Sequence, residues 1–312
     1  MDNVNRSKLL LLRPDSRETA LKRINLDETQ FKVLVEIFKK WAEQQPHFKK
    51  KDFNKNHYEM LLLNAKGSVE RAKKIEDKYN TFRSLMPEFF SYWDLIDDYK
   101  NIFKLMMPIL LPKLTSDHHR VYVVRIIEDF RSSEVQLKSC KLNLLQADYM
   151  KYYDFSSGLH IIIDCFNVNL LEVFPKMDVI LLKKLFTILM EGYGMRVLGI
   201  YYLTTSKLID SVISLVKQAL KPKVASRISV LKTYEDLYKF VDRDILPIEM
   251  GGSEKSISEI HEDWYQEFSS DDFKAYLHEL EKVGTNEELR PSDKFNDEYA
   301  GMPGTFRVLN VD

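Results

Sequence analysis

Few side chains of this sequence stand at spacings that catalytic chemistry requires. It contains no G-x-S-x-G turn for a serine nucleophile and no G-x-x-x-x-G-K-S/T phosphate loop. His118 and His119 are adjacent, so on a strand they would point to opposite faces, and a turn before a strand explains them better than a shared metal ion. His160 and Asp164 lack a partner motif, and we interpret both as structural hydrogen-bonding residues. We therefore expect no catalytic residue, metal or cofactor, and no enzyme.

One segment couples an apolar helix to a basic stretch. A helix is expected over 206–220, because its apolar residues recur at helical spacing. Five positive charges and no acid lie between Ser211 and Tyr234. An apolar face beside a basic patch can touch an anionic membrane or shelter a lipid. A core helix with a solvated basic turn is the alternative, and this segment alone favours that alternative.

The composition is that of a globular chain. Of 312 residues, 45% are hydrophobic and 30% charged, and the net charge of −1 argues against bulk nucleic-acid binding. The two cysteines, Cys140 and Cys165, indicate neither a zinc site nor a disulfide framework. Lys183 and Lys184 break the strongest apolar stretch, so no membrane span is expected. These features predict a cytoplasmic protein that meets membranes peripherally.

The charge is unevenly spread. Residues 251–312 carry 15 acidic and 6 basic side chains, so the basic surplus lies in the rest of the chain. The acidic segment 254–298 is a possible contact surface for a protein partner. Beyond it, the residues Phe306, Val308 and Leu309 are expected to lay the C-terminal tail on the body.

The order of expected elements predicts the fold class. Helical periodicity dominates residues 26–90, with Asp27 and Ser68 as cap residues, and more helix is expected over 87–112. Runs rich in β-branched and aromatic residues follow, separated by long helical stretches. The strands are expected at 121–127, 159–163, 196–203 and 227–231, and the helices at 133–153, 178–192 and 206–220. This alternation predicts an α/β layer with a mostly parallel sheet.

Apolar faces of these strands and helices could enclose a slot on the order of a few hundred Å³. An ordinary filled core produces the same pattern, and periodicity alone does not separate the two. Tyr193, Tyr201 and Tyr202 could offer a hydroxyl or carbonyl end a polar partner, and aromatic core packing is the alternative. The candidate ligand-binding residues are Leu159, Ile161, Ile163, Leu185, Ile188, Leu189, Tyr193, Leu198, Ile200, Tyr202, Val212, Leu215 and Val216.

Several motifs together resemble those of the CRAL-TRIO family, which includes cellular retinaldehyde-binding protein and tocopherol transfer protein. They are the helical stretch from Asn56 to Phe90, GLHIIIDCFN from Gly158, EGYGMRVLGIYYL from Glu191, and LPIEMGG from Leu246. The ending TFRVLNVD is similar to that of insect members. The resemblance covers about residues 26–282.

The resemblance implies an N-terminal three-helix bundle followed by an α/β lipid-binding domain with a mostly parallel sheet. In the family the sheet is the pocket floor, and the helix matching 206–220 is a mobile lid that meets the membrane. The implied divisions are 1–25, an extension; 26–90, the bundle; 91–252, the lipid-binding domain; and 253–312, acidic helices and a tail. The implied anionic-lipid-binding set is Arg196, Lys217, Lys221, Lys223 and Arg227.

The expected function is therefore intracellular binding and transfer of a hydrophobic small molecule: a carotenoid, retinoid, tocopherol or similar isoprenoid. A regulator that senses phospholipid or phosphoinositide and acts through a protein partner is the alternative. At the entrance to the lid, Thr204, Thr205 and Ser206 replace the family's Asn-x-Pro. This departure leaves phosphoinositide exchange open, while contact with an anionic membrane is still expected.

Overall fold

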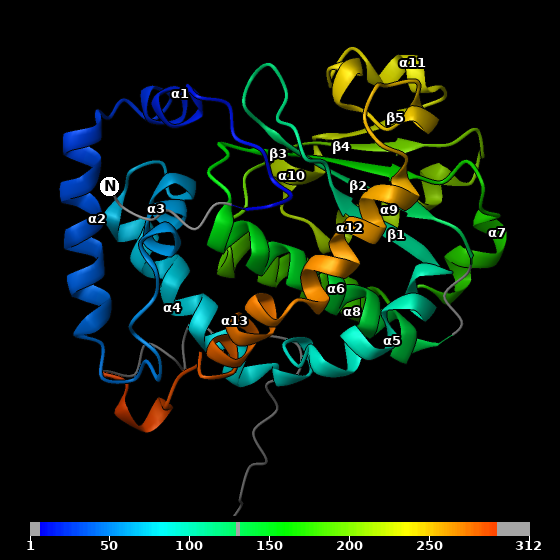
Figure 1. The fold of residues 1–312 in the computed structure, drawn as a ribbon. Coiled ribbons are helices and arrows are strands. Elements are labelled where there is room, and N and C mark those ends of the chain that lie inside the picture. The colour runs from blue at the N-terminus through cyan, green and yellow to red at the C-terminus, as the bar shows by residue number, and fades with distance from the viewer. Residues whose placement is uncertain (1–6, 129–131, 292–312) are drawn as a thin grey trace, which may run out of the picture.

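A computed structural model describes residues 7–128 and 132–291 of the chain. A five-stranded sheet in the order β1-β2-β3-β4-β5 lies at its centre, with β1 antiparallel to β2 and the other neighbours parallel. Figure 1 shows α6 and α8 on one side of the sheet and α11 on the other. The strands are β1 Met106–Leu110, β2 Arg120–Ile126, β3 Leu159–Asp164, β4 Val197–Leu203 and β5 Ile228–Leu231. The predicted α/β class with a mostly parallel sheet is confirmed.

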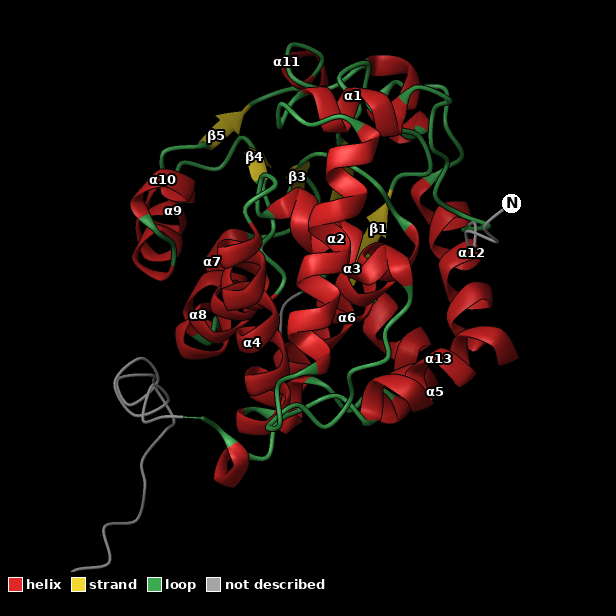
Figure 2. Cartoon of the chain, turned by 90° about the vertical axis from the view of Figure 1, so that its left-hand side faces the viewer, coloured by secondary structure: helices red, strands yellow, loops and turns green. Residues whose placement is uncertain are grey.

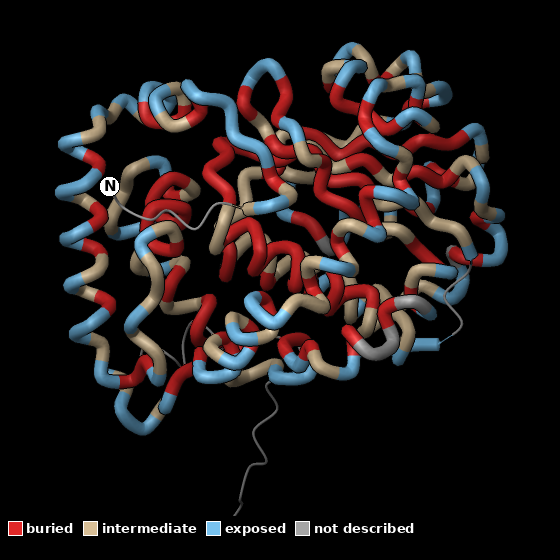
Figure 3. The backbone as a smooth tube through the Cα atoms, viewed as in Figure 1, coloured by how far each residue is buried: buried red, intermediate tan, exposed pale blue. Residues whose placement is uncertain are grey.

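The N-terminal part is helical, as predicted. Its helices are α1 Ser16–Lys22, α2 Glu28–Glu43, α3 Lys55–Asn64 and α4 Val69–Leu85. Asp27 and Gln30 form a capping box at the start of α2, and Ser68 caps α4 by accepting a hydrogen bond from the backbone of Arg71. Buried and exposed residues alternate along α2 with the helical period, as Figure 3 shows, because its apolar side faces the rest of this bundle.

The remaining helices cover the sheet and its edges. The helices α8 and α9 contact each other, and both lie below β5 in the view of Figure 2. These helices are α5 Trp93–Phe103, α6 Ser133–Tyr153, α7 Leu170–Val173, α8 Val179–Thr187, α9 Ile209–Ala219, α10 Pro222–Ala225, α11 Tyr234–Leu237, α12 Ile257–Ser269 and α13 Asp271–Glu281. A π-turn, Ile188–Gly192, directly continues α8. None of the helices described is both long and apolar enough to cross a membrane.

Strand β1 was not predicted, since the sequence indicated a transition with more helix at 87–112. Its residue Pro108 has no N–H to donate, which a sheet tolerates at an edge, and β1 is the edge strand here. Its antiparallel pairing with β2 places Pro108 opposite Val124 and Leu110 opposite Tyr122.

A buried carboxylate joins the N-terminal helices to the α/β part. Asp148 of α6 is fully buried and accepts hydrogen bonds from the hydroxyls of Tyr79, Tyr92 and Tyr193 at 2.7 to 2.9 Å. The Arg83 guanidinium donates to the same carboxylate at 2.5 Å. Burial would make this charge costly if it were alone, and its four donors compensate it.

The predicted tail contacts of Phe306, Val308 and Leu309 lie outside the described residues.

Candidate functional site

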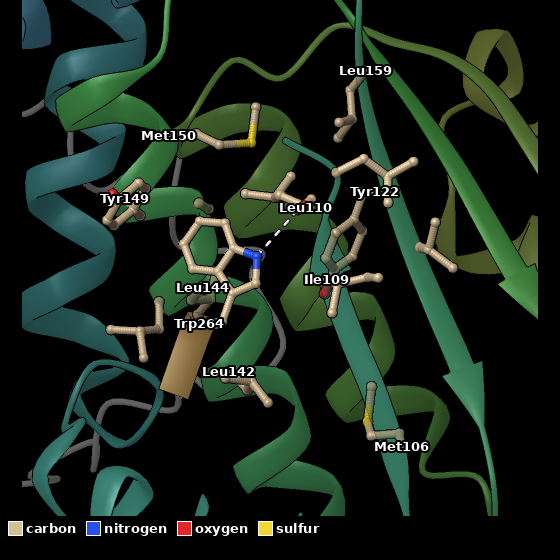
Figure 4. Close-up of a cluster of buried hydrophobic side chains, with 14 of the residues drawn as sticks. Met106, Ile109, Leu110, Tyr122, Leu142, Leu144, Tyr149, Met150, Leu159 and Trp264 are labelled. Carbon is tan, nitrogen blue, oxygen red and sulfur yellow. Dashed lines mark hydrogen bonds between the residues drawn. The ribbon is translucent and has the colours of Figure 1, made fainter. Parts of the chain in front are cut away.

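A cavity of about 220 Å³ lies between one face of the sheet and the helices α6, α8 and α9. Its floor is made by alternate residues of four strands, and the pairing Tyr122 to Ile161 and Ile163 to Tyr202 keeps them on one face. The floor residues are Met106, Leu110, Tyr122, Val124, Ile126, Leu159, Ile161, Ile163 and Tyr202. Figure 4 shows several of them, with Met150 of α6 close by.

The helix α9 covers this floor with an apolar face. Ile209, Val212 and Val216 line the cavity and are buried, whereas Ser214 and Lys217 are exposed on the outer side. The helix is therefore amphipathic, and its inner face is held mainly by apolar packing against β4 and α8.

The walls come from α6, α8 and the π-turn. Both cysteines lie on the cavity wall, and burial raises the pKa of Cys140 and of Cys165 to about 12, so both thiols stay neutral. The wall side chains are Gln136, Ser139, Cys140, Asn143, Gln146, Ala147 and Met150 of α6, Leu181, Leu182, Leu185 and Phe186 of α8, and Leu189 and Met190 of the π-turn.

Eight of the thirteen predicted ligand-binding residues lie on the cavity surface. They are Leu159, Ile161, Ile163, Leu185, Leu189, Tyr202, Val212 and Val216. Ile188 and Ile200 are buried in the packing around the cavity, and Leu215 is half-buried on α9. Tyr193 is buried away from the cavity, where its hydroxyl donates to Asp148 at 2.7 Å.

Leu198 was a candidate ligand-binding residue, but it does not line the cavity. A shift of register pairs Leu159 with Val197 but His160 with Gly199, so Leu198 is an extra residue without a partner on β3. Val197 joins the apolar packing around Ile200 instead, and the Leu198 side chain lies over Gly158.

The polar side chains on the wall are almost all satisfied within the protein. The Tyr122 hydroxyl donates to Asn143 at 2.6 Å, and Asn143 donates to the Ser139 carbonyl at 2.6 Å. The amide of Gln136 donates to the carbonyl of Lys176 and accepts from the backbone of Asp178.

Gln146 is the exception on this wall. Its Nε2 donates to the Pro108 carbonyl at 2.8 Å, but its Oε1 is buried without a partner. None of the α6 residues on this wall was predicted, because apolar and polar side chains are mixed around the whole of this helix.

The other residues flagged in the sequence have structural partners. His118 lies in a turn before β2 and hydrogen-bonds Ser16, and His160 hydrogen-bonds the Tyr201 hydroxyl at 3.1 Å. The Asp164 carboxylate accepts from Arg125 and Tyr234 at 3.0 Å each. Within the described residues, no group of three or more His, Cys, Asp or Glu could hold a metal ion.

Positive side chains gather beside the domain, where the N-terminal helices meet β4 and α10. We define the basic cluster as Lys66, Arg71, Arg196, Lys223 and Arg227. The nearby positive charges, Arg196 foremost, lower the pKa of Lys66. Burial first, and then Arg23, Arg227 and Arg71, lower the pKa of Arg196. The guanidinium atom Nη1 of Arg196 is buried without a partner. The cluster therefore repels itself and would be stabilised by an anion.

The basic cluster contains three of the five predicted anionic-lipid-binding residues: Arg196, Lys223 and Arg227. The ammonium of Lys221 lies 2.7 Å from Glu191, so this charge is paired. Lys217 is exposed on the outer side of α9. Lys66 and Arg71 come from the loop before α4 and its first turn, and no local sequence signal connects them to residues 196–227.

Comparisons with known proteins bear on the α/β part. Residues 106–252 match the family model of the CRAL/TRIO domain, from β1 to the glycine pair that follows Met250. A search of the curated proteins finds no match. Among solved structures, one similar chain is described as the crystal structure of Sfh5. It is 14% identical, with a TM-score of 0.41, over 80% of this chain and 92% of that one.

CRAL/TRIO domains bind hydrophobic small molecules, and the cavity is lined almost wholly by apolar side chains. Residues 106–252 of the chain thus match the CRAL/TRIO domain, a lipid-binding domain.

Proposed function

We propose that this protein binds an isoprenoid lipid, such as a carotenoid, retinoid or tocopherol, and carries it between membranes in the cytoplasm. The observation that carries the proposal is the apolar cavity between the sheet and α9. Burying roughly 400 Å² of ligand surface at about 25 cal/mol/Å² gives on the order of 10 kcal/mol before the costs of association. Apolar walls alone can therefore hold such a cargo.

In this proposal α9 is a lid that moves to admit the cargo. Its inner residues Val212 and Val216 separate the cavity from solvent. Apolar packing has no fixed direction, so the helix can repack against a membrane interior at little cost.

The proposal includes no catalysis. Asp178 is the carboxylate on the cavity wall, and its oxygen already accepts the backbone N–H groups of Ile180 and Leu181 at the start of α8. An acid or base engaged in this way is poorly placed to move a substrate proton.

Contact with an anionic lipid surface is the second part of the proposal. The unpartnered Nη1 of Arg196 and the mutual repulsion within the basic cluster support it. The same observation favours a second candidate, a phospholipid-sensing regulator that signals through a protein bound to the acidic segment 254–298.

The first experiment identifies what the protein carries. Mass spectrometry of lipid extracted from protein purified out of its native tissue should find an isoprenoid, while a phospholipid would favour the regulator. In parallel, Ala147→Phe places a ring into the cavity, since Ala147 is buried on its wall. We expect this variant to lose most of its capacity for retinol, measured by ligand fluorescence.

The matched control is Ile180→Phe, which adds the same ring on the exposed outer side of α8. It should keep wild-type capacity and a similar unfolding temperature. Equal retinol binding by both variants would show that the cargo does not occupy this cavity.

A further inference from the structure

We infer that the cargo is an alcohol, whose hydroxyl donates a hydrogen bond to Oε1 of Gln146 at the far end of the cavity from α9. The inference rests on the proposed function, because it names the chemical class of the molecule carried. In this inference, Gln146 is the residue that distinguishes an alcohol from related lipids that have no hydrogen-bond donor.

The amide orientation of Gln146 is fixed by its partner. Its Nε2 lies 2.8 Å from the carbonyl oxygen of Pro108, and a carbonyl can only accept. The opposite orientation would set two acceptors against each other. Oε1 is therefore the free end of this side chain, which is only 1% exposed and belongs to the cavity wall.

An unpaired acceptor at such a depth is uncommon in folded proteins. On the wall of this cavity the Gln146 oxygen is the buried side-chain atom left without a hydrogen bond among the described residues. Gln136 belongs to the same helix and the same wall, yet both ends of its amide are engaged. Gln146 belongs to the cavity wall, so we assign the missing partner to a molecule in the cavity, and that molecule must donate.

The position of Gln146 orients the cargo. Pro108 belongs to β1, whereas Val212 and Val216 of the lid pack with residues of β4. Three strand spacings separate β1 from β4, a distance of about 14 Å. An elongated molecule would thus place its hydroxyl against Gln146 and its hydrocarbon end under α9.

Related groups fit this end less well. An aldehyde, ester or ether oxygen can only accept, so each would leave the Gln146 oxygen unpaired and face it with a second acceptor. An ionised carboxylate would add a buried negative charge beside this acceptor. Selection by a buried hydrogen bond discriminates strongly, because the wrong ligand leaves protein groups unsatisfied.

The test compares three ligands with nearly the same hydrocarbon: retinol, retinaldehyde and the methyl ether of retinol. Binding is measured by fluorescence or by competition against one fluorescent fatty probe. We expect wild-type protein to bind retinol on the order of tenfold more tightly than either acceptor-only ligand. In Gln146→Met, which keeps the length but has no acceptor, this preference should fall to about one.

The control is Gln136→Met on the same wall. It loses hydrogen bonds within the protein but should keep the wild-type preference for retinol, even if its stability falls. Because the readout is a ratio of affinities in each variant, partial unfolding does not mimic the result.

The outcomes separate the two claims. Failure of all three ligands to bind would contradict the proposed function. Equal binding of the three by wild-type protein, or an unchanged preference in Gln146→Met, would overturn the alcohol assignment alone and leave Oε1 to a water molecule.

Discussion

Lys151 is a buried lysine without a hydrogen bond. Its Nζ lies 3.0 Å from the centre of the Tyr79 ring and 3.8 Å from a carboxylate oxygen of Glu76. Burial lowers the pKa of Lys151 to about 7, because removal from water penalises the ammonium form more than Glu76 and Asp148 stabilise it.

This shift predicts how stability depends on pH. In the unfolded chain the pKa of a lysine is about 10.4. Between that pH and 7, the unfolded chain holds a proton that folded Lys151 has lost, so the free energy of unfolding rises with pH, by at most about 1.4 kcal/mol per unit. Below pH 7 the penalty is fully present. Urea unfolding at pH 7.5 to 9 should show a smaller rise in Lys151→Met.

Lys239→Met is the control for this prediction, because the Lys239 side chain is 71% exposed. It should follow the wild-type dependence across the same range. A Lys151→Met protein with the same slope as wild type would mean that Lys151 keeps its proton when folded.

Period-two alternation predicted most of the cavity floor at the level of single residues. Leu159, Ile161 and Ile163 lie on it because strand side chains alternate strictly. The same rule misplaced Leu198, since an extra residue in β4 has no signature in the sequence. The sequence could not predict Gln146 as a binding residue. The feature that marks it is a buried side-chain oxygen without a hydrogen bond, and only the folded structure reveals this.

At the scale of elements, α9 joins an apolar inner face to a polar outer one. Val216 is 1% exposed on the inner face, and Ser214 is exposed on the outer face two residues earlier. A charge should therefore disrupt the packing of α9 at Val216 but not at Ser214, although both residues lie on the same helix.

We predict that Val216→Asp detaches α9 from the cavity. A carboxylate without a partner in this apolar surrounding costs several kcal/mol, which solvation of the opened helix would relieve. Hydrogen exchange of residues 209–219 should become faster by at least tenfold, and retained ligand should be lost. In Ser214→Asp neither should change. Unaltered exchange in Val216→Asp would argue that α9 is a fixed wall rather than a lid.

The regular elements were easier to predict than the irregular ones. The runs VYVVRII and LHIII became β2 and β3 because β-branched residues favour a buried parallel sheet. The run MMPIL forms β1 although it holds a proline. It was not predicted, because its pairing partner β2 lies further along the chain and the run itself carries no strand signal.

At the scale of the whole molecule, the basic cluster is shared between two parts of the chain. Lys66 and Arg71 come from the N-terminal helices, and Arg196, Lys223 and Arg227 from the α/β part. The sequence predicted anionic-lipid binding only for the residues of the α/β part. Lys66 and Arg71 were missed because they are distant in the chain and approach the others only when the N-terminal helices pack against the domain.

This arrangement predicts which charges attract an anionic membrane. We expect Lys66→Glu with Lys223→Glu to weaken binding to phosphatidylserine vesicles at least tenfold at low salt, since each basic residue near the surface contributes about 1 kcal/mol. The pair Lys217→Glu with Lys221→Glu should also weaken binding and cargo release. We expect a smaller effect from it, because Glu191 already pairs Lys221.

Lys39→Glu with Lys239→Glu is the control, because it changes the net charge equally at two sites outside the cluster, of which Lys239 is exposed and Lys39 half-buried. Equal losses from this pair and from the Lys66 and Lys223 pair would show that only net charge matters, and that the cluster has no special role at the membrane.

The buried carboxylate of Asp148 has a consequence for how the chain is made. Its donors Arg83 and Tyr193 lie on opposite sides of it in sequence, and the Leu280 carbonyl accepts a further bond from Arg83. A chain emerging from the ribosome cannot complete this arrangement before residue 280 has been synthesised. The four donors to the carboxylate are all present only once Tyr193 has been made, and until then the charge on α6 is compensated in part. We therefore expect the N-terminal helices to complete their packing against α6 only after Tyr193 has been synthesised.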